Sequence, residues 1–392
     1  MPVNFIEIRS QITEMGKNAK LFEQQQNDLR EQARQTFNEF AERIDLLCET
    51  VEKAKKENSK LRCAVPVEEG LTFSASSITP EDPYALLAAD GSQVNPSRHD
   101  SIQFSVINVG AIRMYPGQPE APREFTRTRL LYHDDLYTST GPLTEGDVAL
   151  RRDLNERLFL AELAGREETT VIALTDGPLE LYYEARESPE FIKNLQKYLD
   201  ALHSLKRMNA AAAGYVDRPR GDLVIRLLEL MILDEEDLSQ TGRQRPLQGV
   251  TDEELFREIL EPGQRSAIFA IQSISAQKFA GALSLHFFYL NVGRVGYPSL
   301  GRVEIPAWVA SDMRLVNLLH SALVAQCQQM GSQPYPYALH RAHEIAVVSF
   351  DEKSKVQNMI ALELYQHGVQ IGESSPKQAS KETMHTRKRH QI

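Results

Sequence analysis

The sequence is poor in cysteine, lacks a long apolar run and carries no excess of positive charge. Its 392 residues include three cysteines without a C-x-x-C pair, which argues against a disulfide framework or a cysteine-rich zinc site. No segment reaches the ~18 consecutive apolar residues of a membrane span, and the chain does not open like a signal peptide. The formal net charge is -10, so any nucleic-acid contact must be local. We expect a cytoplasmic protein with free thiols and no membrane association.

Two motifs of common enzyme classes are also missing. No G-x-x-x-x-G-K-[ST] segment occurs, so we do not expect the chain to hydrolyse ATP itself. No G-x-S-x-G surrounds Ser92, which argues against a covalent serine mechanism. We predict a structural role for Ser92, although a turn at this position could also offer its amides to a phosphate.

The length and the N-terminal pattern predict a large domain with a helical appendage. The chain is too long for one ordinary core at ~150 residues per domain. In the segment 1–66, seam positions that are apolar except for Gln26 alternate by four and three from Ile8 to Ala33, and the pattern resumes from Phe37 to Ala54 after a stutter. We expect a long helix or a helical hairpin with a coiled-coil seam. It either packs on its own core or also mediates dimerisation or partner docking.

Short apolar runs alternate with helical patterns over residues 67–372, which predicts one α/β domain. The segment 146–165 reads as a helix that ends at a glycine. Residues 234–252 are polar, acidic and interrupted by glycine and proline, so we expect a mobile insertion or a loop. The final segment, 373–392, is polar and then basic without apolar periodicity, and we expect a disordered tail.

Two apolar runs end in the same dipeptide. The run 84–90 closes on Asp90 and the run 171–176 closes on Asp176, each followed by glycine. Asp-Gly is common in turns, and either copy alone would be explained by chain reversal. Taken together they favour chemistry, because a carboxylate at the end of a buried strand can hold a hard divalent cation through oxygen. We predict one shared metal site.

A glutamate from the helix 146–165 would complete such a site. Metal-dependent phosphodiester cleavage needs oxygen ligands from several segments, because the ions must activate water and stabilise the leaving oxygen. Asp90, Asp176 and one helical glutamate would suit. Glu156 can project toward the sheet, and Glu162 lies on the leucine stripe of the helix as a second candidate.

A tyrosine and a histidine near the C-terminus are further candidates. His343 shares a helix stripe with Leu339 and Ala346, so we predict that it faces inward. A lone inward histidine is ordinarily a satisfied core residue, but the two Asp-Gly strands favour a ligand or a phosphate-contacting role. Tyr335 is predicted to orient a phosphate, to stack on a base or only to pack, with Tyr337 as a nearby substitute.

Together these features resemble the NurA nuclease family. The resemblance rests on Asp90-Gly-Ser after a strand, an acidic helix before Asp176-Gly, and Tyr335 with His343, in the family's order over residues 80–350. It implies an α/β fold with an RNase H-like mixed sheet flanked by helices. It also implies a Mn²⁺- or Mg²⁺-dependent nuclease that acts on DNA ends, and a homodimer beside a hexameric HerA-type ATPase.

The resemblance assigns roles by position. It implies four metal-binding residues, which are Asp90, Glu156, Asp176 and His343. It also implies that Tyr335 is a further catalytic residue. The segment 152–157 resembles the family's helix better than the surroundings of Glu162 do, so Glu156 is preferred. An imidazole among carboxylates favours Mn²⁺ over Mg²⁺, which prefers oxygen ligands.

We expect single-stranded endonuclease and 5′-to-3′ exonuclease activity on DNA ends, in end resection and recombinational repair. Relatives often place a lysine where Asp217 stands, so a basic contact to DNA is either missing or supplied by Arg218. An exposed arginine is more often a solvated surface residue than a DNA contact. The predicted DNA-binding residues are Arg152, Arg157, Arg218 and Arg302.

Two other functions stay open. The same fold would serve a non-catalytic DNA-repair scaffold or binding protein that uses its N-terminal helices to dock a partner. It would also serve a metal-dependent phosphatase or RNase. A scaffold would show no metal-dependent cleavage, and a comparison of substrates with one metal would separate the enzymes.

Overall fold

The chain divides into two compact units, each of which draws on several parts of the sequence. The computed structural model describes residues 4–80, 82–97, 100–139, 141–181 and 188–369. The predicted tail at 373–392 lies outside the described residues. The first unit comprises Met1–Pro80, Gly177–Leu181 and Ala213–Tyr335, and the second comprises Glu81–Asp176, Tyr182–Ala212 and Pro336–Ile392.

The second unit is built on a mixed sheet with the strand order β5-β4-β3-β8. Antiparallel pairing joins β3 to β4 and β4 to β5, whereas β3 and β8 are parallel. The strands are β3 (Tyr84–Val94), β4 (Ser105–Met114), β5 (Arg123–Leu131) and β8 (Thr170–Asp176). This arrangement confirms the predicted α/β fold with an RNase H-like mixed sheet.

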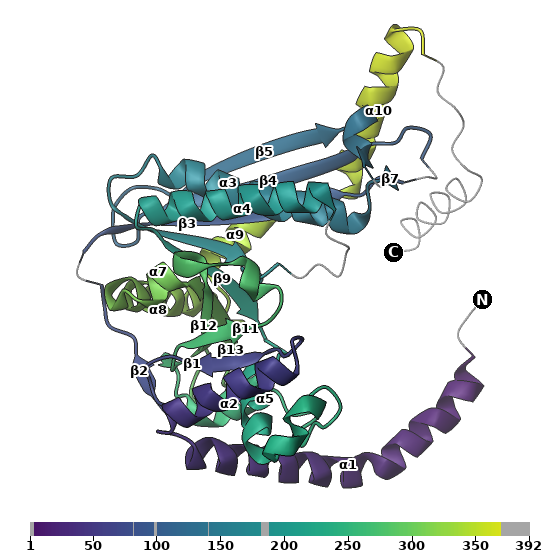
Figure 1. Ribbon diagram of the computed structural model, residues 1–392. Coiled ribbons are helices and arrows are strands. Elements are labelled where there is room, and N and C mark those ends of the chain that lie inside the picture. Colours follow the sequence, from purple (N-terminus) through teal and green to yellow (C-terminus); the bar gives the residue numbers. More distant parts are fainter. Residues whose placement is uncertain (1–3, 81, 98–99, 140, 182–187, 370–392) are drawn as a thin grey trace. The chain divides into compact units, whose positions relative to one another are not determined.

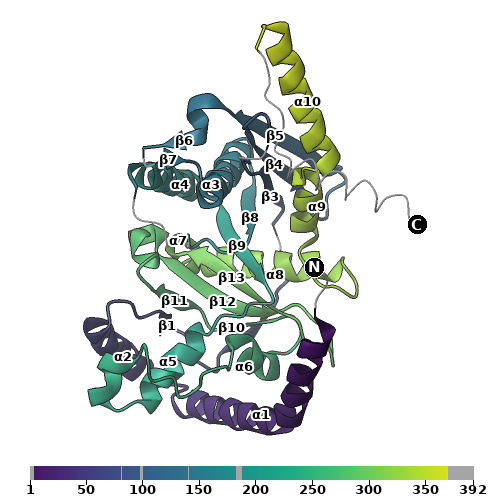
Figure 2. The same cartoon turned by 90° about the vertical axis from the view of Figure 1, so that its right-hand side faces the viewer.

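Helices cover both faces of this sheet, with α3 and α4 on one side and α9 on the other (Figure 2). A capping box between Thr144 and Asp147 begins α3, whose bounds confirm the helix predicted at 146–165. The helices of the unit are α3 (Glu145–Ala164), α4 (Pro189–Arg207), α9 (Tyr337–Ala346) and α10 (Phe350–Gln366). Its short elements are η1 (His133–Leu136), β6 (Tyr137–Thr138) and β7 (Gly141–Pro142).

The strand that carries Asp90 is longer than its sequence indicates. We expected the strand to end at Asp90, but β3 runs for 11 residues to Val94. Antiparallel pairing with β4 continues past Asp90, which faces Gly110, to the pair Val94 and Val106. The parallel pairing with β8 stops one residue before Asp90. Asp90 therefore lies inside β3, at the point where pairing with one of the two neighbouring strands, β8, has ended.

The first unit contains an antiparallel sheet with the order β1-β11-β12-β13-β9, and β10 joins it to β2. Its core is rich in aromatic rings; for example, Phe256 stacks on Tyr289 at 4.8 Å between centroids. The strands are β1 (Cys63–Pro66), β2 (Ser74–Ser76), β9 (Ala211–Asp217), β10 (Gln264–Ser266), β11 (Phe269–Gln272), β12 (Leu285–Asn291) and β13 (Leu300–Pro306).

Two helices at the N-terminus confirm the predicted helical segment. They are α1 (Phe5–Glu39), a 35-residue helix, and α2 (Ile44–Glu57). Both contact α5, and the N-terminal part of α1 extends beyond the strands of its own unit (Figure 1). The other helices of the unit are α5 (Leu223–Ile232), η2 (Glu235–Gln240), α6 (Asp252–Ile259), η3 (Ala276–Lys278), η4 (Gly281–Leu283), α7 (Ala307–Ala310) and α8 (Met313–Gln328).

The apolar seam of the N-terminal helices is covered in one part and exposed in another. The seam residues Leu47, Val51 and Ala54 of α2 are buried, as are Ala33 and Phe37 of α1. Earlier positions of α1 are exposed in this single chain, namely Ile8, Ile12, Met15 and Phe22. Packing within the unit therefore buries the second half of the apolar seam and leaves the first half uncovered.

Residues 234–252, expected as a mobile insertion or a loop, contain η2 and are anchored to the first unit. Leu238 and Leu247 are buried. Arg245 donates to Glu229 at 2.7 Å and to Asp222 at 2.6 Å. These contacts favour a fixed segment over a mobile one. Among the described residues, no helix has both the length and the apolar character that crossing a bilayer requires.

Candidate active site

The register of β3 and β8 brings the two Asp-Gly segments together in the second unit. The last parallel pair is Ala89 with Thr175, so the next residues, Asp90 and Asp176, stand side by side. Neighbouring strands lie about 4.8 Å apart, and residues in the same register point to the same face. The Asp90 side chain is 12% exposed, and Asp176 is exposed at the end of β8. Strand pairing thus brings the two predicted aspartates to neighbouring positions on β3 and β8.

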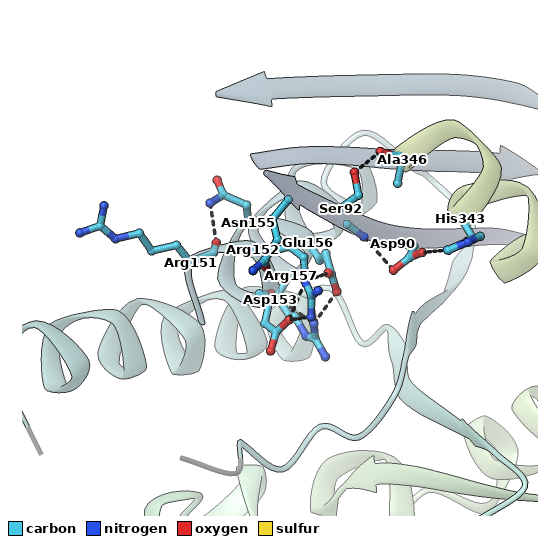
Figure 3. Close-up of polar contacts among 12 residues, drawn as sticks. Asp90, Ser92, Arg151, Arg152, Asp153, Asn155, Glu156, Arg157, His343 and Ala346 are labelled. Atoms are coloured by element: carbon cyan, nitrogen blue, oxygen red, sulfur yellow. Dashed lines mark hydrogen bonds and ion pairs between the residues drawn. The ribbon is translucent and has the colours of Figure 1, made fainter. Parts of the chain in front are cut away.

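Asp90 accepts two hydrogen bonds. The Gly91 N–H donates to Oδ1 at 2.8 Å, and the His343 Nδ1 lies 2.7 Å from Oδ2 as the second donor (Figure 3). We predicted that His343 faces inward, and this is wrong, because its side chain is 62% exposed. The buried stripe of α9 consists of smaller apolar residues, such as Ala342 and Ala346. His343 lies beside that stripe and reaches Asp90 with its imidazole turned toward solvent.

A glycine on β4 allows α9 to approach the sheet closely. A Cβ on Gly110 would lie 2.6 Å from the Ala346 N and 2.7 Å from the Ala342 O. The same helix end is held by side chains, because Ser92 Oγ and Asn108 Nδ2 both donate to the Ala346 carbonyl, at 2.5 and 2.8 Å. The predicted structural role of Ser92 is confirmed, since it fixes the helix that carries His343. No sequence motif marks Gly110 or Asn108.

A second glycine opens the other face of β3 to helix α3. A Cβ on Gly91 would lie 2.7 Å from Glu156 Oε1 and 2.6 Å from Arg152 Cγ. Successive side chains of a strand point to opposite faces, so Asp90 faces α9 and Gly91 faces α3. Glu156 therefore approaches β3 where there is no side chain to exclude it (Figure 3).

Glu156 is buried among charges of both signs. Its Oε2 accepts from Arg157 Nη1 at 2.6 Å, and its Oε1 lies 3.5 Å from Arg152 Nε. Burial raises the pKa of Glu156 well above its usual range; Arg157 opposes the shift, and the negative charges of Asp153 and Asp90 add to it. Burial and the neighbouring acids thus outweigh the effect of Arg157 and Arg152 on the Glu156 carboxylate.

The alternative helical glutamate is placed elsewhere. Glu162 is 42% exposed and pairs with Arg166 at 2.5 Å and with Arg127 of β5. These partners lower the pKa of Glu162, with the Arg127 hydrogen bond as the largest cause. Of the two candidates, only Glu156 lies against the strand that carries Asp90.

The predicted ligands are of the chemical type that a hard divalent cation prefers. Asp90, Asp176 and Glu156 offer carboxylate oxygens from three elements, and His343 offers an imidazole, which suits Mn²⁺ somewhat better than Mg²⁺. As the side chains lie, no three His, Cys, Asp or Glu residues within the described part of the chain form a group that could hold an ion. Glu156 is on the α3 side with its carboxylate taken by arginines, while His343 occupies one oxygen of Asp90.

The other predicted residues have separate surroundings. Tyr335 belongs to the first unit, where its ring packs edge-on against Tyr215 at 5.7 Å. Arg302 is buried in the same unit and donates to Glu304 at 2.8 Å, so its charge is not presented to a phosphate as we predicted. Arg157 is buried as well, paired with Glu156 and placed over the Tyr198 ring.

Arg152 and Arg218 keep accessible charge. The side chain of Arg152 is 32% exposed, and that of Arg218 is 79% exposed. Of the four predicted DNA-binding arginines, only these two are more than slightly exposed, and Arg152 also donates to Asp153 at 2.9 Å. The sequence could not separate them from Arg157 and Arg302, because burial depends on partners far along the chain.

The sequence matches one known family over most of its length. Residues 84–348 match the family model described as the NurA domain, and no curated protein matches the chain. Among solved structures, the NurA nuclease from Sulfolobus solfataricus is similar, at 14% identity over 85% of this chain and 98% of that one, with a TM-score of 0.47.

Two endonuclease V structures are also similar. The human catalytic domain shares 12% identity over 81% of this chain and 98% of its own, with a TM-score of 0.32. The Ciona intestinalis enzyme, in complex with a 24mer DNA, shares 10% identity over 79% and 96%, with a TM-score of 0.30. All these TM-scores are below 0.5, so the family assignment rests on the match to the NurA domain.

Proposed function

Because this chain belongs to the NurA-domain family, which makes it a nuclease, we propose that it is a metal-dependent deoxyribonuclease. The observation that carries the proposal is the parallel register of β3 and β8, which sets Asp90 beside Asp176. Glu156 approaches the same strand over Gly91 from the other face. Three acids from three elements are the ligand type that hydrolysis of a phosphodiester with divalent ions requires.

The proposed roles follow from the surroundings of each residue. Asp90, Asp176, Glu156 and His343 would hold Mn²⁺ or Mg²⁺, which supplies an activated water and charge neutralisation at the leaving oxygen. In the structure, His343 donates to Asp90 and so fixes the carboxylate orientation, while its exposed ring can also contact a phosphate. Arg152, close to Glu156 and partly exposed, is positioned to contact a phosphate oxygen.

The finer features of the activity come from the family resemblance. We infer single-stranded endonuclease and 5′-to-3′ exonuclease activity on DNA ends, in cytoplasmic end resection and recombinational repair. We also infer a homodimer and a hexameric HerA-type ATPase as partner. Tyr335 is inferred as a further catalytic residue, and Tyr335→Phe should then lower cleavage without lowering the melting temperature.

The proposal is tested by cleavage of end-labelled single-stranded DNA and duplex DNA with Mn²⁺ or Mg²⁺. We expect cleavage with the metal, loss with EDTA, and strong loss in Asp90→Ala and Asp176→Ala. Thermal shift provides a readout that does not depend on activity, since Mn²⁺ should raise the melting temperature of the unaltered chain and not of Asp90→Ala. Full cleavage in either aspartate variant would refute the carboxylate assignment.

One observation favours the alternative of a binding or scaffold protein. The exposed apolar residues of α1 form a surface that packing within its own unit leaves uncovered; they include Ile12, Met15 and Phe22. A scaffold of this kind would bind a partner through α1 and show no metal-dependent cleavage even with a cognate ATPase. Removal of residues 1–24 would then abolish partner binding, measured by co-sedimentation, while a nuclease would keep its cleavage of short substrates.

A further inference from the structure

The first unit contains a hollow of about 860 Å³ with a basic lining. Four arginines line it, Arg218 and Arg220 after β9, Arg257 on α6 and Arg294 in the turn between β12 and β13. Glu253 is the acid of the same lining. In a chain with a formal net charge of -10, such a concentration of positive charge is local.

Three of these arginines are available to a ligand. Arg257 pairs with Glu253, so its charge is already compensated. Arg218 is 79% exposed, and its Nε is 3.9 Å from Asp217 Oδ2, which is a weak contact. Arg220 and Arg294 are exposed, and neither forms an ion pair with any residue that the structure describes. The hollow therefore presents guanidinium groups whose hydrogen-bond donors face solvent.

One edge of the hollow is a short hairpin that holds a basic and an aromatic side chain together. Arg294 and Tyr297 exchange backbone hydrogen bonds at 3.0 and 2.8 Å around a turn with Gly296 at a φ of +78°. Asn291 Oδ1 accepts from Gly293 N–H and Ser299 N–H, at 2.9 and 3.2 Å, and so fixes the base of the hairpin. This backbone is ordered before any ligand arrives, which lowers the entropic cost of binding.

The aromatic residue of the hairpin is open to solvent. Tyr297 is 80% exposed and its neighbour Val295 is 87% exposed, although both line the hollow. Arginine forks bind phosphate oxygens, and an open aromatic ring stacks on an unpaired base. A duplex hides the faces of its bases, so the combination suits a single strand.

We propose that this hollow holds a single-stranded segment of the DNA substrate, with phosphates on Arg220 and Arg294 and a base on Tyr297. The identity of the substrate rests on the proposed deoxyribonuclease function. The volume lies within the ~300–1,000 Å³ of sites that enclose small ligands, so it suits a few nucleotides and not a whole duplex. Arg218 adds a further contact to the same strand.

Fluorescence anisotropy with a labelled oligothymidylate tests the proposal, in EDTA so that binding is measured without cleavage. We expect the double variant Arg220→Ala/Arg294→Ala to bind more weakly and to lower the slope of log affinity against log salt by about 1.4, since each single-strand phosphate contact contributes about 0.7. Tyr297→Ala should bind about tenfold more weakly with an unchanged salt slope, and Tyr297→Phe should bind normally.

Arg314→Ala is the matched control, because Arg314 is an exposed arginine of the same unit outside the hollow, and it should bind like the unaltered chain. Melting temperatures check that every variant is folded. Unchanged affinity and salt slope in the double variant would overturn the proposal.

A small phosphodiester, bis(p-nitrophenyl) phosphate, separates this proposal from the proposed function. With Mn²⁺, the double variant should hydrolyse it as fast as the unaltered chain does, since this substrate has no strand to occupy the hollow. If the unaltered chain hydrolyses neither this ester nor DNA while the double variant still binds oligothymidylate more weakly, the nuclease assignment fails and the binding hollow stands.

Discussion

Buried acids occur in both units, but their surroundings differ. In the first unit, each buried carboxylate accepts hydrogen bonds from several donors. The fully buried Glu229, for example, accepts from Arg226 at 2.5 Å, from Arg245 at 2.7 Å and from the Leu247 N–H at 3.1 Å. Glu304 similarly accepts from Arg302 and two backbone N–H groups. These carboxylates have their charge compensated within the fold.

In the second unit, the acids at β3 lie close to other acids. Asp90 stands beside Asp176 in register, and its charge adds to the raised pKa of Glu156. The donors of Asp90 are its own neighbour Gly91 and the exposed His343. Glu229 is surrounded by donors that stabilise the fold, whereas Asp90 keeps an acidic neighbour and an exposed donor, as suits an acid that can take a metal. Glu156, buried and paired with Arg157, lies between the two cases. We therefore expect that neutralising an acid at β3 lowers cleavage and leaves stability almost unchanged, whereas neutralising a buried acid of the first unit lowers stability.

The largest expected effect contrasts Asp90→Asn with Glu229→Gln. Asp90→Asn should reduce metal-dependent cleavage about a thousandfold, because metal assistance supplies several kcal/mol, and should hardly change the midpoint of urea unfolding. Glu229→Gln should lower the free energy of unfolding by about 3–5 kcal/mol, since it removes the charge that pairs with the buried Arg226 and the partly buried Arg245. Cleavage assays and urea titrations on both variants check this. Equal loss of stability in the two would remove the distinction between the sites.

A smaller effect concerns the pH dependence of the first unit. His320 is buried with its Nε2–H donating to the Gly263 carbonyl at 2.9 Å, and burial lowers its pKa to about 4. The unfolded chain binds this proton near pH 6.5 and the folded chain does not, so the free energy of unfolding falls as pH decreases from 6.5 toward 4, by roughly 3 kcal/mol at most.

Melting temperatures between pH 7 and 5 measure this dependence. His320→Gln keeps a donor for Gly263 and cannot titrate, so its curve should be flatter. The exposed His203 offers the control, and His203→Gln should follow the unaltered chain. A curve for His320→Gln as steep as that of the unaltered chain would assign the pH dependence to other groups.

The smallest effect tests the approach of α3 to the sheet. Gly91→Ala would put a Cβ 2.7 Å from Glu156 Oε1, so the glutamate must move away from β3. We expect a tenfold to hundredfold loss of cleavage, as for a catalytic group misplaced by about 1 Å, with a change of only a few degrees in melting temperature. In the control Gly146→Ala, on α3 itself, the new Cβ meets its nearest atom at 3.7 Å, and cleavage should not change. Normal cleavage by Gly91→Ala would mean that Glu156 acts without approaching β3.

The sequence predicted the elements better than their contacts. Apolar periodicity and a final glycine predicted α3, and the two Asp-Gly runs predicted two buried strands. The length of β3 was missed, because Gly91 to Gln93 are polar or small and the end of the strand is held by β4, whose pairing has no local signal. The exposure of His343 was missed because only the packing of α9 on Gly110 decides which side of that helix is covered.

The arginines show the same limit. Arg157 and Arg302 resemble Arg152 and Arg218 in sequence, and the structure separates them by burial against Glu156 and Glu304. Such partners are set by side-chain packing in three dimensions. The family resemblance supplied a complete set of metal ligands, which no local pattern in the chain could supply, and that set stays a prediction.

The hydrogen bond between His343 and Asp90 joins positions that are 253 residues apart. During synthesis the ribosome releases Asp90 early, whereas α9 emerges only after nearly the whole of the described chain has been made. A truncated or nascent product therefore contains both Asp-Gly strands and α3 but lacks the helix that orients the first aspartate. The order of the elements along the chain therefore delays the contact between His343 and Asp90 until α9 has been made.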